Sequence, residues 1–120
     1  MGFKLDIAHN EAGGYLAYTV AGPWTLQNTY ALIDSIKQET GRHGVTRVLV
    51  DMRATEGLPS DMDRYKWGVR AAEVLGGRVR VAVLGRSEQI NRFGENTAVN
   101  RGADVNTLTD PDEALRWLTR

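Results

Sequence analysis

Residues 47–52 constrain the fold of this chain more than any other segment. Their sequence, Arg-Val-Leu-Val-Asp-Met, holds three consecutive apolar residues between two charged ones. A strand with one face in water alternates apolar and polar residues, whereas this run is apolar on both faces. Such a strand is suited to a place between two layers of helices, so we expect residues 48–50 at the centre of a mostly parallel sheet.

Strand-like and helix-like patterns alternate along the rest of the chain. Residues 3–8 and 15–20 have the composition of strands, and the turn between them contains Gly13 and Gly14, so we expect an antiparallel hairpin. After the hairpin come a helix capped by Thr25, the strand at 47–52, a loop at 54–60, a helix ending at Leu75, a strand at 79–84, a helix capped by Ser87, a strand at 105–108 and a helix beginning at Asp110-Pro111. This order predicts the α/β class: a mostly parallel β-sheet with an N-terminal antiparallel hairpin and four helices, in one domain spanning residues 1–120.

The spacing of apolar residues predicts the buried face of each middle helix. The inward residues are predicted to be Tyr65, Val69, Ala72 and Leu75 in the second helix and Ile90, Phe93 and Thr97 in the third. Trp67 falls off the apolar face of the second helix. We therefore expect an exposed Trp67, where an aromatic side chain suits an interface.

The composition bounds the classes of partner. Fifteen basic and fifteen acidic side chains cancel, so the net field is too weak to gather nucleic acid over a distance, and we expect no nucleic-acid partner. The chain has no cysteine, which excludes disulfides and thiolate metal sites. No apolar run approaches the ~20 residues that span a bilayer, and Lys4 and Asp6 interrupt any signal-peptide core. We expect a cytoplasmic protein.

Two strand-to-helix segments and the third helix resemble a known family. Arg47-Val-Leu-Val-Asp51 leads into a loop and a helix, and Val79-Arg-Val-Ala-Val83 leads into another. This succession, over nearly the whole chain, resembles the STAS domains typified by anti-sigma-factor antagonists. Residues 92–102, Arg-Phe-Gly-Glu-Asn-Thr-Ala-Val-Asn-Arg-Gly, followed by residues 110–118, are similar to the SpoIIAA-like branch of small bacterial proteins, often discussed together with CRAL-TRIO lipid-transfer domains. The resemblance implies a STAS-like fold and a non-catalytic regulatory or protein-binding role.

The resemblance also implies a candidate phosphorylation site. In signalling STAS domains the loop after the central strand presents an Asp-Ser-Ser/Thr-Gly motif, whose serine is phosphorylated by a partner kinase. This chain lacks the motif and places only Ser60 near the start of the next helix. A phosphate there would gain from the free N–H groups and the dipole of the helix start, while disturbing a partner docked on the loop. The alternative is that Ser60 or Asp61 is merely an N-cap.

Asp51 and Arg53 are candidate ligand-binding residues. They follow the apolar run of the central strand, at the carboxyl end where open α/β sheets collect ligands. There they could orient a polar ligand. Alternatively, Asp51 accepts hydrogen bonds from loop amides and Arg53 is solvated.

Asn96, Asn100 and Arg101 form a second candidate surface, on the third helix. Asn96 and Asn100 share a face because they are four residues apart. Their amides and the guanidinium could build a polar recognition surface. Alternatively, they hydrogen-bond to neighbouring loops, and Arg101 complements the helix dipole.

Aromatic residues offer a third kind of site. An apolar cavity for a lipid or aromatic ligand, which the CRAL-TRIO comparison implies, could be lined by Trp24, Trp67, Trp117, Tyr18, Tyr30 and Tyr65. Packing in the core is the alternative for all of them.

Signals of catalysis are weak. His9 lies in a turn and His43 follows a helix, and neither has a nearby partner at metal-ligand or triad spacing. The chain contains no nucleophile elbow, P-loop or dinucleotide fingerprint. Arg78 and Arg80 could contact phosphate, but arginines at strand ends are usually solvated. We therefore expect no enzyme activity, no metal and no cofactor.

The leading hypothesis is a STAS-like protein-interaction module with an unknown protein partner, which it contacts through the loop at 54–60 and the helix bearing Trp67. The runner-up is a small carrier that holds an apolar or amphipathic molecule between helices and sheet near Asp51. A hydrolase or transferase built around Asp51 and Arg53 is a minor alternative, because one carboxylate without a base, nucleophile or metal is incomplete. A homo-oligomer is a further expectation, since the hairpin edge and an exposed aromatic invite pairing.

Overall fold

A five-stranded mixed sheet organises residues 2–120, which the computed structural model describes. The strands lie side by side in chain order: β1 (Lys4–Asn10), β2 (Tyr15–Pro23), β3 (Arg47–Glu56), β4 (Arg80–Leu84) and β5 (Asp104–Leu108). β1 and β2 are antiparallel, and all other neighbours are parallel. The predicted hairpin and the predicted mostly parallel α/β sheet are confirmed.

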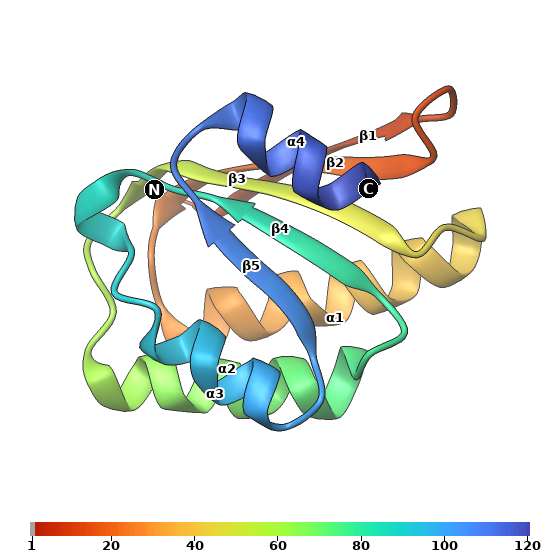
Figure 1. The fold of residues 1–120 in the computed structure, drawn as a ribbon. Coiled ribbons are helices and arrows are strands. Elements are labelled where there is room, and N and C mark those ends of the chain that lie inside the picture. Colours follow the sequence, from red (N-terminus) through yellow and green to blue (C-terminus); the bar gives the residue numbers. More distant parts are fainter. Residues whose placement is uncertain (1) are drawn as a thin grey trace.

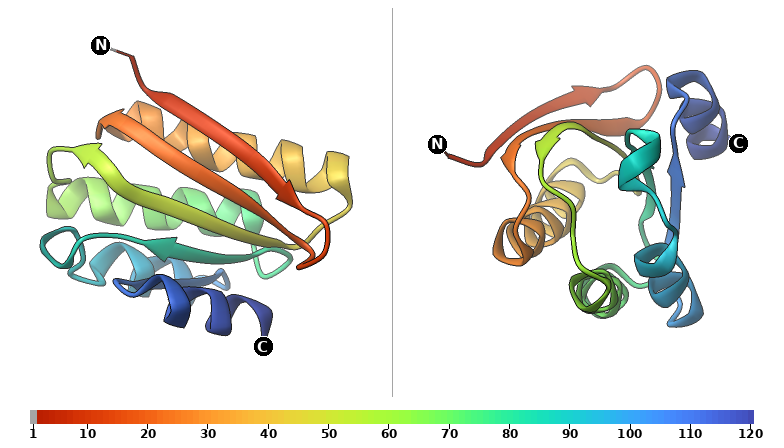
Figure 2. Two further views of the ribbon diagram at one scale, coloured as in Figure 1. Left: turned by 90° about the horizontal axis from the view of Figure 1, so that it is seen from above. Right: turned by 90° about the vertical axis from the view of Figure 1, so that its left-hand side faces the viewer.

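Helices cover the two faces of this sheet unequally. They are α1 (Leu26–His43), α2 (Asp61–Leu75), α3 (Phe93–Asn100) and α4 (Pro111–Thr119), with a short 3-10 turn, η1 (Ser87–Gln89), before α3. α1, α2 and α3 lie on one face and α4 lies on the other (Figure 1). α4 packs against β3, β4 and β5, and Figure 2 shows that the outer face of the β1–β2 hairpin extends beyond it.

β3 lies at the centre of the sheet, as the apolar run predicts. Val48 and Val50 are fully buried in the main core on the side of α1 and α2. Leu49 points to the other face and packs in the smaller cluster beneath α4. Full burial of an apolar side chain such as Val48 or Val50 contributes roughly 1.5–3 kcal/mol, and the partly buried Leu49 adds a smaller amount from the other face.

Side-chain caps define α1 and α4 as the sequence predicts. Thr25 accepts a backbone N–H of the first turn of α1, and Gly44 ends that helix in the left-handed conformation, with a φ of 67°. Asp110 caps α4 in the same way, and Pro111 occupies its first turn, where no N–H is needed. Each side-chain cap is worth about 1 kcal/mol.

β3 is longer than predicted. Residues 54–56, predicted to begin a loop, continue the strand and pair with residues 21–23 of β2. The register between the two strands shifts between Thr19 and Ala21, and the pairing resumes beyond that irregularity. Because β2 also runs past its predicted end, it supplies backbone partners that the side-chain pattern does not reveal. The connection from β3 to α2 is therefore only residues 57–60.

The predicted inward faces of α2 and α3 are wrong in part. The buried residues are Arg64, Gly68, Ala71 and Leu75 in α2 and Gly94, Glu95 and Ala98 in α3. Tyr65 and Phe93, predicted to face the core, are 40% and 42% exposed. The two helices approach each other through glycines, so their contact requires small residues where the pattern favoured large apolar ones.

The third helix also begins later than predicted. Ser87 opens η1 and caps no α-helix, and α3 begins only at Phe93. The side-chain amide of Gln89 donates to the carbonyl oxygen of Met52 at 3.2 Å and to the hydroxyl of Thr55 at 3.0 Å. These bonds hold η1 against the end of β3. The η1 segment is therefore separate from α3 and does not form one helix with it.

Candidate functional site

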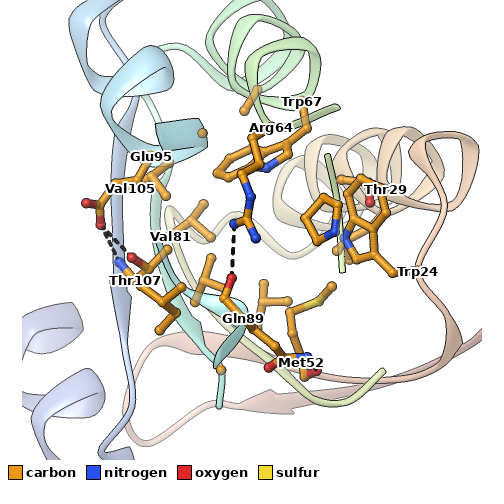
Figure 3. Close-up of a pocket in the computed structure, with 18 of the residues that line it drawn as sticks. Trp24, Thr29, Met52, Arg64, Trp67, Val81, Gln89, Glu95, Val105 and Thr107 are labelled. Carbon is orange, nitrogen blue, oxygen red and sulfur yellow. Dashed lines mark hydrogen bonds between the residues drawn. The ribbon is translucent and has the colours of Figure 1, made fainter. Parts of the chain in front are cut away.

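A cavity of about 130 Å³ lies between the sheet and the three helices of the main layer. Apolar side chains dominate its wall, and the indoles of Trp24 and Trp67 stand at its sides (Figure 3). Pro59 and Ile90, from the segments that follow β3 and β4, line one end. That end lies beyond the carboxyl ends of parallel strands, the edge where open α/β sheets bind ligands.

A buried arginine projects into this cavity. Arg64, in the first turns of α2, is only 8% exposed and points into the space between the two indoles and the sheet (Figure 3). Its Nη1 donates to the carbonyl oxygen of Gln89 at 3.0 Å. Burial lowers the pKa of Arg64, while the nearby charge of Asp61 opposes that shift. A guanidinium stays protonated in proteins, so the cavity contains a positive charge.

Glu95 is the buried acid in the cavity wall, and its oxygens are already engaged. Oε1 accepts hydrogen bonds from the backbone N–H and the hydroxyl of Thr107, and Oε2 pairs with Arg92 at 3.0 Å. These contacts fasten α3 to β5 and compensate the charge of the carboxylate. The sequence interpretation missed both Arg64 and Glu95, because charged residues are expected in water.

Ser60 lies at the start of α2, and its capping role is confirmed. Its hydroxyl oxygen accepts the N–H of Asp63 at 3.1 Å, and the residue is exposed. Leu58 and Met62, two residues to either side, are 57% and 61% exposed. The sequence interpretation did not single out these two apolar residues, although Met62 stands between two aspartates at a helix start.

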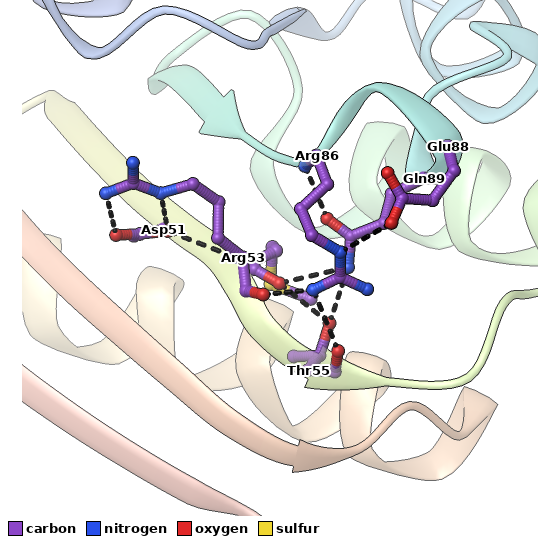
Figure 4. Close-up of polar contacts among 7 residues, drawn as sticks. Asp51, Arg53, Thr55, Arg86, Glu88 and Gln89 are labelled. Atoms are coloured by element: carbon purple, nitrogen blue, oxygen red, sulfur yellow. Dashed lines mark hydrogen bonds and ion pairs between the residues drawn. The ribbon is translucent and has the colours of Figure 1, made fainter.

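Asp51 and Arg53 pair with each other rather than facing the cavity. The Nε and Nη2 of Arg53 donate to the two carboxylate oxygens of Asp51 at 3.0 and 2.9 Å (Figure 4). These hydrogen bonds lower the pKa of Asp51, against a smaller opposing effect of burial. Val50 and Met52 line the cavity, and alternate residues of a strand point to opposite faces. The cavity thus lies between helices and sheet next to Asp51, but the Asp51 and Arg53 side chains point to the opposite face of β3, and their role in binding a ligand stays a prediction.

Arg86 and Gln89 tie the η1 segment to the end of β3 (Figure 4). Arg86 Nη1 donates to the carbonyl oxygens of Arg53 and Thr55, and Arg86 Nε pairs with Glu88 at 2.9 Å. The side-chain oxygen of Gln89 accepts the backbone N–H of Arg86 at 2.7 Å. This network holds one end of the cavity in place.

Solved structures share this arrangement of sheet, helices and loops, although no protein-family model and no curated protein sequence matches the chain. An anti-sigma factor antagonist from Mycobacterium paratuberculosis superposes with a TM-score of 0.67 at 18% sequence identity, over 99% of this chain and 96% of that one. An uncharacterised protein with a SpoIIAA-like fold, from Shewanella loihica, superposes with a TM-score of 0.57 at 23% identity, over 98% and 93% of the two chains. This chain has a SpoIIAA-like fold.

A third solved structure agrees with the SpoIIAA-like fold. A Ser-to-Glu variant of RsbS from Moorella thermoacetica superposes with a TM-score of 0.55 at 15% identity, over 96% of this chain and 94% of that one. The resemblance to STAS and SpoIIAA-like proteins that the sequence indicates is thus confirmed at the level of the fold.

Trp67 is not the exposed aromatic that the sequence predicts for this SpoIIAA-like chain. It is half-buried, packs against the main core and lines the cavity. Its indole lies directly against Gly94, where a β-carbon would collide with the ring. Of the other aromatic residues predicted to line a cavity, Trp24 does so, whereas Trp117 packs with α4 on the opposite face.

The polar residues of α3 lie on the surface of the SpoIIAA-like fold. Asn96 and Asn100 are exposed. Arg101 Nη2 donates to the hydroxyl of Tyr65 at 3.1 Å, and its guanidinium carbon lies 5.7 Å from the centre of that ring. Arg101 therefore contacts α2, none of the three residues lines the cavity, and their role in recognition stays a prediction.

The two histidines are closer than the sequence predicts. The rings of His9 and His43 are 4.7 Å apart, and His43 Nε2 lies 3.6 Å from a carboxylate oxygen of Glu39. His9, predicted to lie in a turn, belongs to β1, and the end of β1 thus meets the end of α1. Across residues 2–120, no group of three His, Asp or Glu side chains is placed to hold a metal ion. Within the same residues, no helix has the length and apolar character to cross a membrane.

Proposed function

We propose that this protein is a non-catalytic regulatory module that binds a protein partner through the surface around Ser60. The observation that carries the proposal is the exposure of Leu58 and Met62 on either side of that serine. Exposed large apolar side chains grouped at one point of a surface favour contact with another protein. This surface, residues 58–62, replaces the predicted one, because Trp67 is half-buried and residues 54–56 belong to β3.

The charge around this surface describes the partner. Glu56 precedes Leu58 by two residues, and Asp61 and Asp63 flank Met62 in the sequence. A complementary partner surface therefore has an apolar pocket with a basic rim. The fold shared with an anti-sigma factor antagonist supports a regulatory protein, such as an anti-sigma factor, in a bacterial cytoplasm.

Phosphorylation of Ser60 is the second part of the proposal. The hydroxyl is exposed at a helix N-terminus, where a phosphate would accept hydrogen bonds from free N–H groups and interact favourably with the helix dipole. The added group is strongly hydrated and would lie between the two apolar contacts. We therefore expect phosphorylation to release the partner.

Photo-crosslinking in the native host tests this proposal. A photoreactive amino acid at position 58 is expected to capture one protein, and the Ser60→Asp variant is expected to lose it. The same amino acid at Val99, an exposed apolar position on α3, is the matched control and should not capture that protein. Equal capture from both positions would contradict the proposal, and mass spectrometry of the chain from its host tests phosphorylation of Ser60.

The cavity favours a second candidate function, a carrier for a small apolar molecule. Its volume of about 130 Å³ is close to that of an engineered cavity of about 150 Å³ that binds benzene. A compact molecule fits this space and a long-chain lipid does not. Extraction of the purified protein and mass spectrometry of the extract is the test, together with titration by benzene-sized probes. A clean extract with no probe binding would exclude this function.

Self-association through β1 also stays a prediction. β1 is an edge strand with a partly exposed Ile7, and edge strands pair readily with other strands. The second reason given for it, an exposed Trp67, no longer holds. Light scattering of the wild type and of Ile7→Lys tests this prediction. A wild-type dimer that the lysine disrupts would support pairing through β1, and a monomeric wild type would contradict it.

A further inference from the structure

We propose that the cavity binds a small monocarboxylate, with the Arg64 guanidinium holding the carboxylate and the apolar wall holding a compact aromatic or branched body. This inference rests on the second candidate function, that the cavity holds a small molecule. It adds the chemistry of the charged end of the ligand and the residue that recognises it.

The first argument is the state of the Arg64 guanidinium. A guanidinium has five N–H donors, and among residues 2–120 the one acceptor that the Arg64 guanidinium reaches by a hydrogen bond is the carbonyl oxygen of Gln89. No carboxylate of these residues lies within ion-pair distance of it. A buried charge without a counter-ion is costly, and an anion in the cavity would remove that cost.

The second argument is that the cavity wall offers no internal counter-ion. Glu95 is the buried carboxylate of the wall, and its oxygens are taken by Thr107 and Arg92. Asp61 is one helical turn before Arg64 but is exposed to water. Acceptors for the remaining N–H donors of the Arg64 guanidinium must therefore come from a bound molecule or from water.

The third argument concerns the kind of anion. The planar guanidinium fork matches the two oxygens of a carboxylate, so that two parallel N–H···O bonds can form. Most of the remaining wall is apolar and includes Leu32 and Ile33, together with Val81 and the indole of Trp67, which Figure 3 shows near Arg64. The other guanidinium in the wall, that of Arg92, is paired with Glu95. A phosphate carries more charge and more oxygens than this one guanidinium can satisfy. A carboxylate on an apolar body can pair with the charge of Arg64 and contact the apolar wall at the same time.

Titration of the purified chain with benzoate, followed by tryptophan fluorescence and calorimetry, tests the inference. Trp24 and Trp67 line the cavity and Trp117 does not, so binding in the cavity should change the fluorescence. Benzyl alcohol has the same ring without the charge, and inorganic phosphate has charge without the ring. We expect both to bind at least about 10-fold more weakly than benzoate. Benzyl alcohol lacks the carboxylate that pairs with the Arg64 guanidinium, and phosphate leaves the apolar wall without a contact.

Three variants complete the test. Arg64→Met, which leaves an apolar side chain in place, is expected to weaken benzoate binding about 10- to 100-fold and to leave benzyl alcohol unchanged. Ala71→Leu fills the cavity while Arg64 stays intact, and it should abolish binding of both ring compounds. Arg116→Met removes an exposed arginine on the opposite face and is the matched control, with no expected effect. Urea unfolding of each variant verifies that it is folded.

The outcomes separate this inference from the function on which it rests. If benzoate and benzyl alcohol bind equally, or if Arg64→Met retains benzoate affinity, the carboxylate assignment is wrong while the cavity still binds a ligand. If phosphate binds as tightly as benzoate, the assignment to a monocarboxylate with an apolar body is wrong. If neither ring compound binds the folded wild type, the carrier function fails as well.

Discussion

Gly68 of α2 lies directly against the backbone of Gly94 in α3. A β-carbon built on Gly68 would stand 2.6 Å from the carbonyl oxygen of Gly94 and 2.8 Å from the β-carbon of Thr97. Real carbon atoms do not approach backbone oxygen so closely, so the two helices have no room for a methyl group at this crossing. The contact sets the rotation of α2, which turns Arg64 and Trp67 toward the cavity and leaves Tyr65 on the surface.

The Gly68→Ala substitution should therefore destabilise the protein. Alanine favours helices over glycine by up to about 1 kcal/mol, but forcing a methyl into this contact costs about 1–3 kcal/mol or more, since the nearest obstructing atom is a backbone oxygen. We expect a net loss of about 1–2 kcal/mol in the free energy of unfolding, measured by urea denaturation. Gly41→Ala is the matched control, because Gly41 lies in α1 with open space around it. That substitution should raise stability by about 0.5–1 kcal/mol, and a similar gain in Gly68→Ala would contradict the packing argument.

The strand order and the sheet core could be predicted because they depend on local periodicity. Residues 48–50 are apolar on both faces, which places β3 in the centre, and the hairpin before Thr25 shows the period and turn residues of paired strands. The extension of β3 through Glu56 could not be predicted in the same way. Its pairing depends on the backbone of β2, which is distant in the sequence and carries no side-chain signal for it.

The candidate site was harder to predict, because its main residue breaks the rule that charged side chains face water. Periodicity placed Tyr65 in the core and gave Arg64, the residue beside it, no role. One signal was present: a glycine inside a helical pattern indicates a close approach of another element. Taking Gly68 as an inward residue rotates the predicted buried face of α2 onto Arg64 and Leu75, as the structure has it. Ser60 was found because capping is local.

Loss of the Ser60 cap should lower stability by a small and specific amount. Ser60→Ala leaves the N–H of Asp63 without its acceptor, so we expect about 1 kcal/mol less free energy of unfolding in urea denaturation. Ser60→Asp should stay close to the wild type, because an aspartate also caps a helix and suits its N-terminal dipole. Ser87→Ala, at an exposed position that caps no α-helix, should change stability by less than about 0.5 kcal/mol. Equal losses in Ser60→Ala and Ser87→Ala would contradict the capping role.

Acidification should remove the stability that the Asp51–Arg53 pair provides. Arg53 lowers the pKa of Asp51, so the unfolded chain binds a proton at a higher pH than the folded chain does. The stabilisation is therefore complete above the unfolded pKa and is lost as pH falls through the folded pKa. We expect the difference in free energy of unfolding between the wild type and Asp51→Asn to shrink from about pH 6 to about pH 3, in urea denaturation across that range. Arg53→Met should remove the same pH-dependent part, and a difference that is constant with pH would exclude the pair as its source.

Arg80 joins β4 to α4 and should be more important for stability than its neighbour Arg78. The sequence interpretation expected a solvated Arg80. In the structure its guanidinium carbon lies 4.2 Å from the ring centre of Trp117. Its Nη1 donates to the Trp117 carbonyl oxygen at 2.7 Å, and its Nε pairs with Asp104 at 3.0 Å. Hydrogen bonds to charged groups contribute about 1.5–3 kcal/mol, so Arg80→Ala should lower the free energy of unfolding by about 2 kcal/mol. Arg78 is exposed, and its guanidinium donates to the carbonyl oxygen of Val74 at the long distance of 3.3 Å, so Arg78→Ala should cost less than about 0.5 kcal/mol. Urea denaturation of both variants measures the contrast, and equal losses would show that the contacts of Arg80 with α4 do not hold that helix on the sheet.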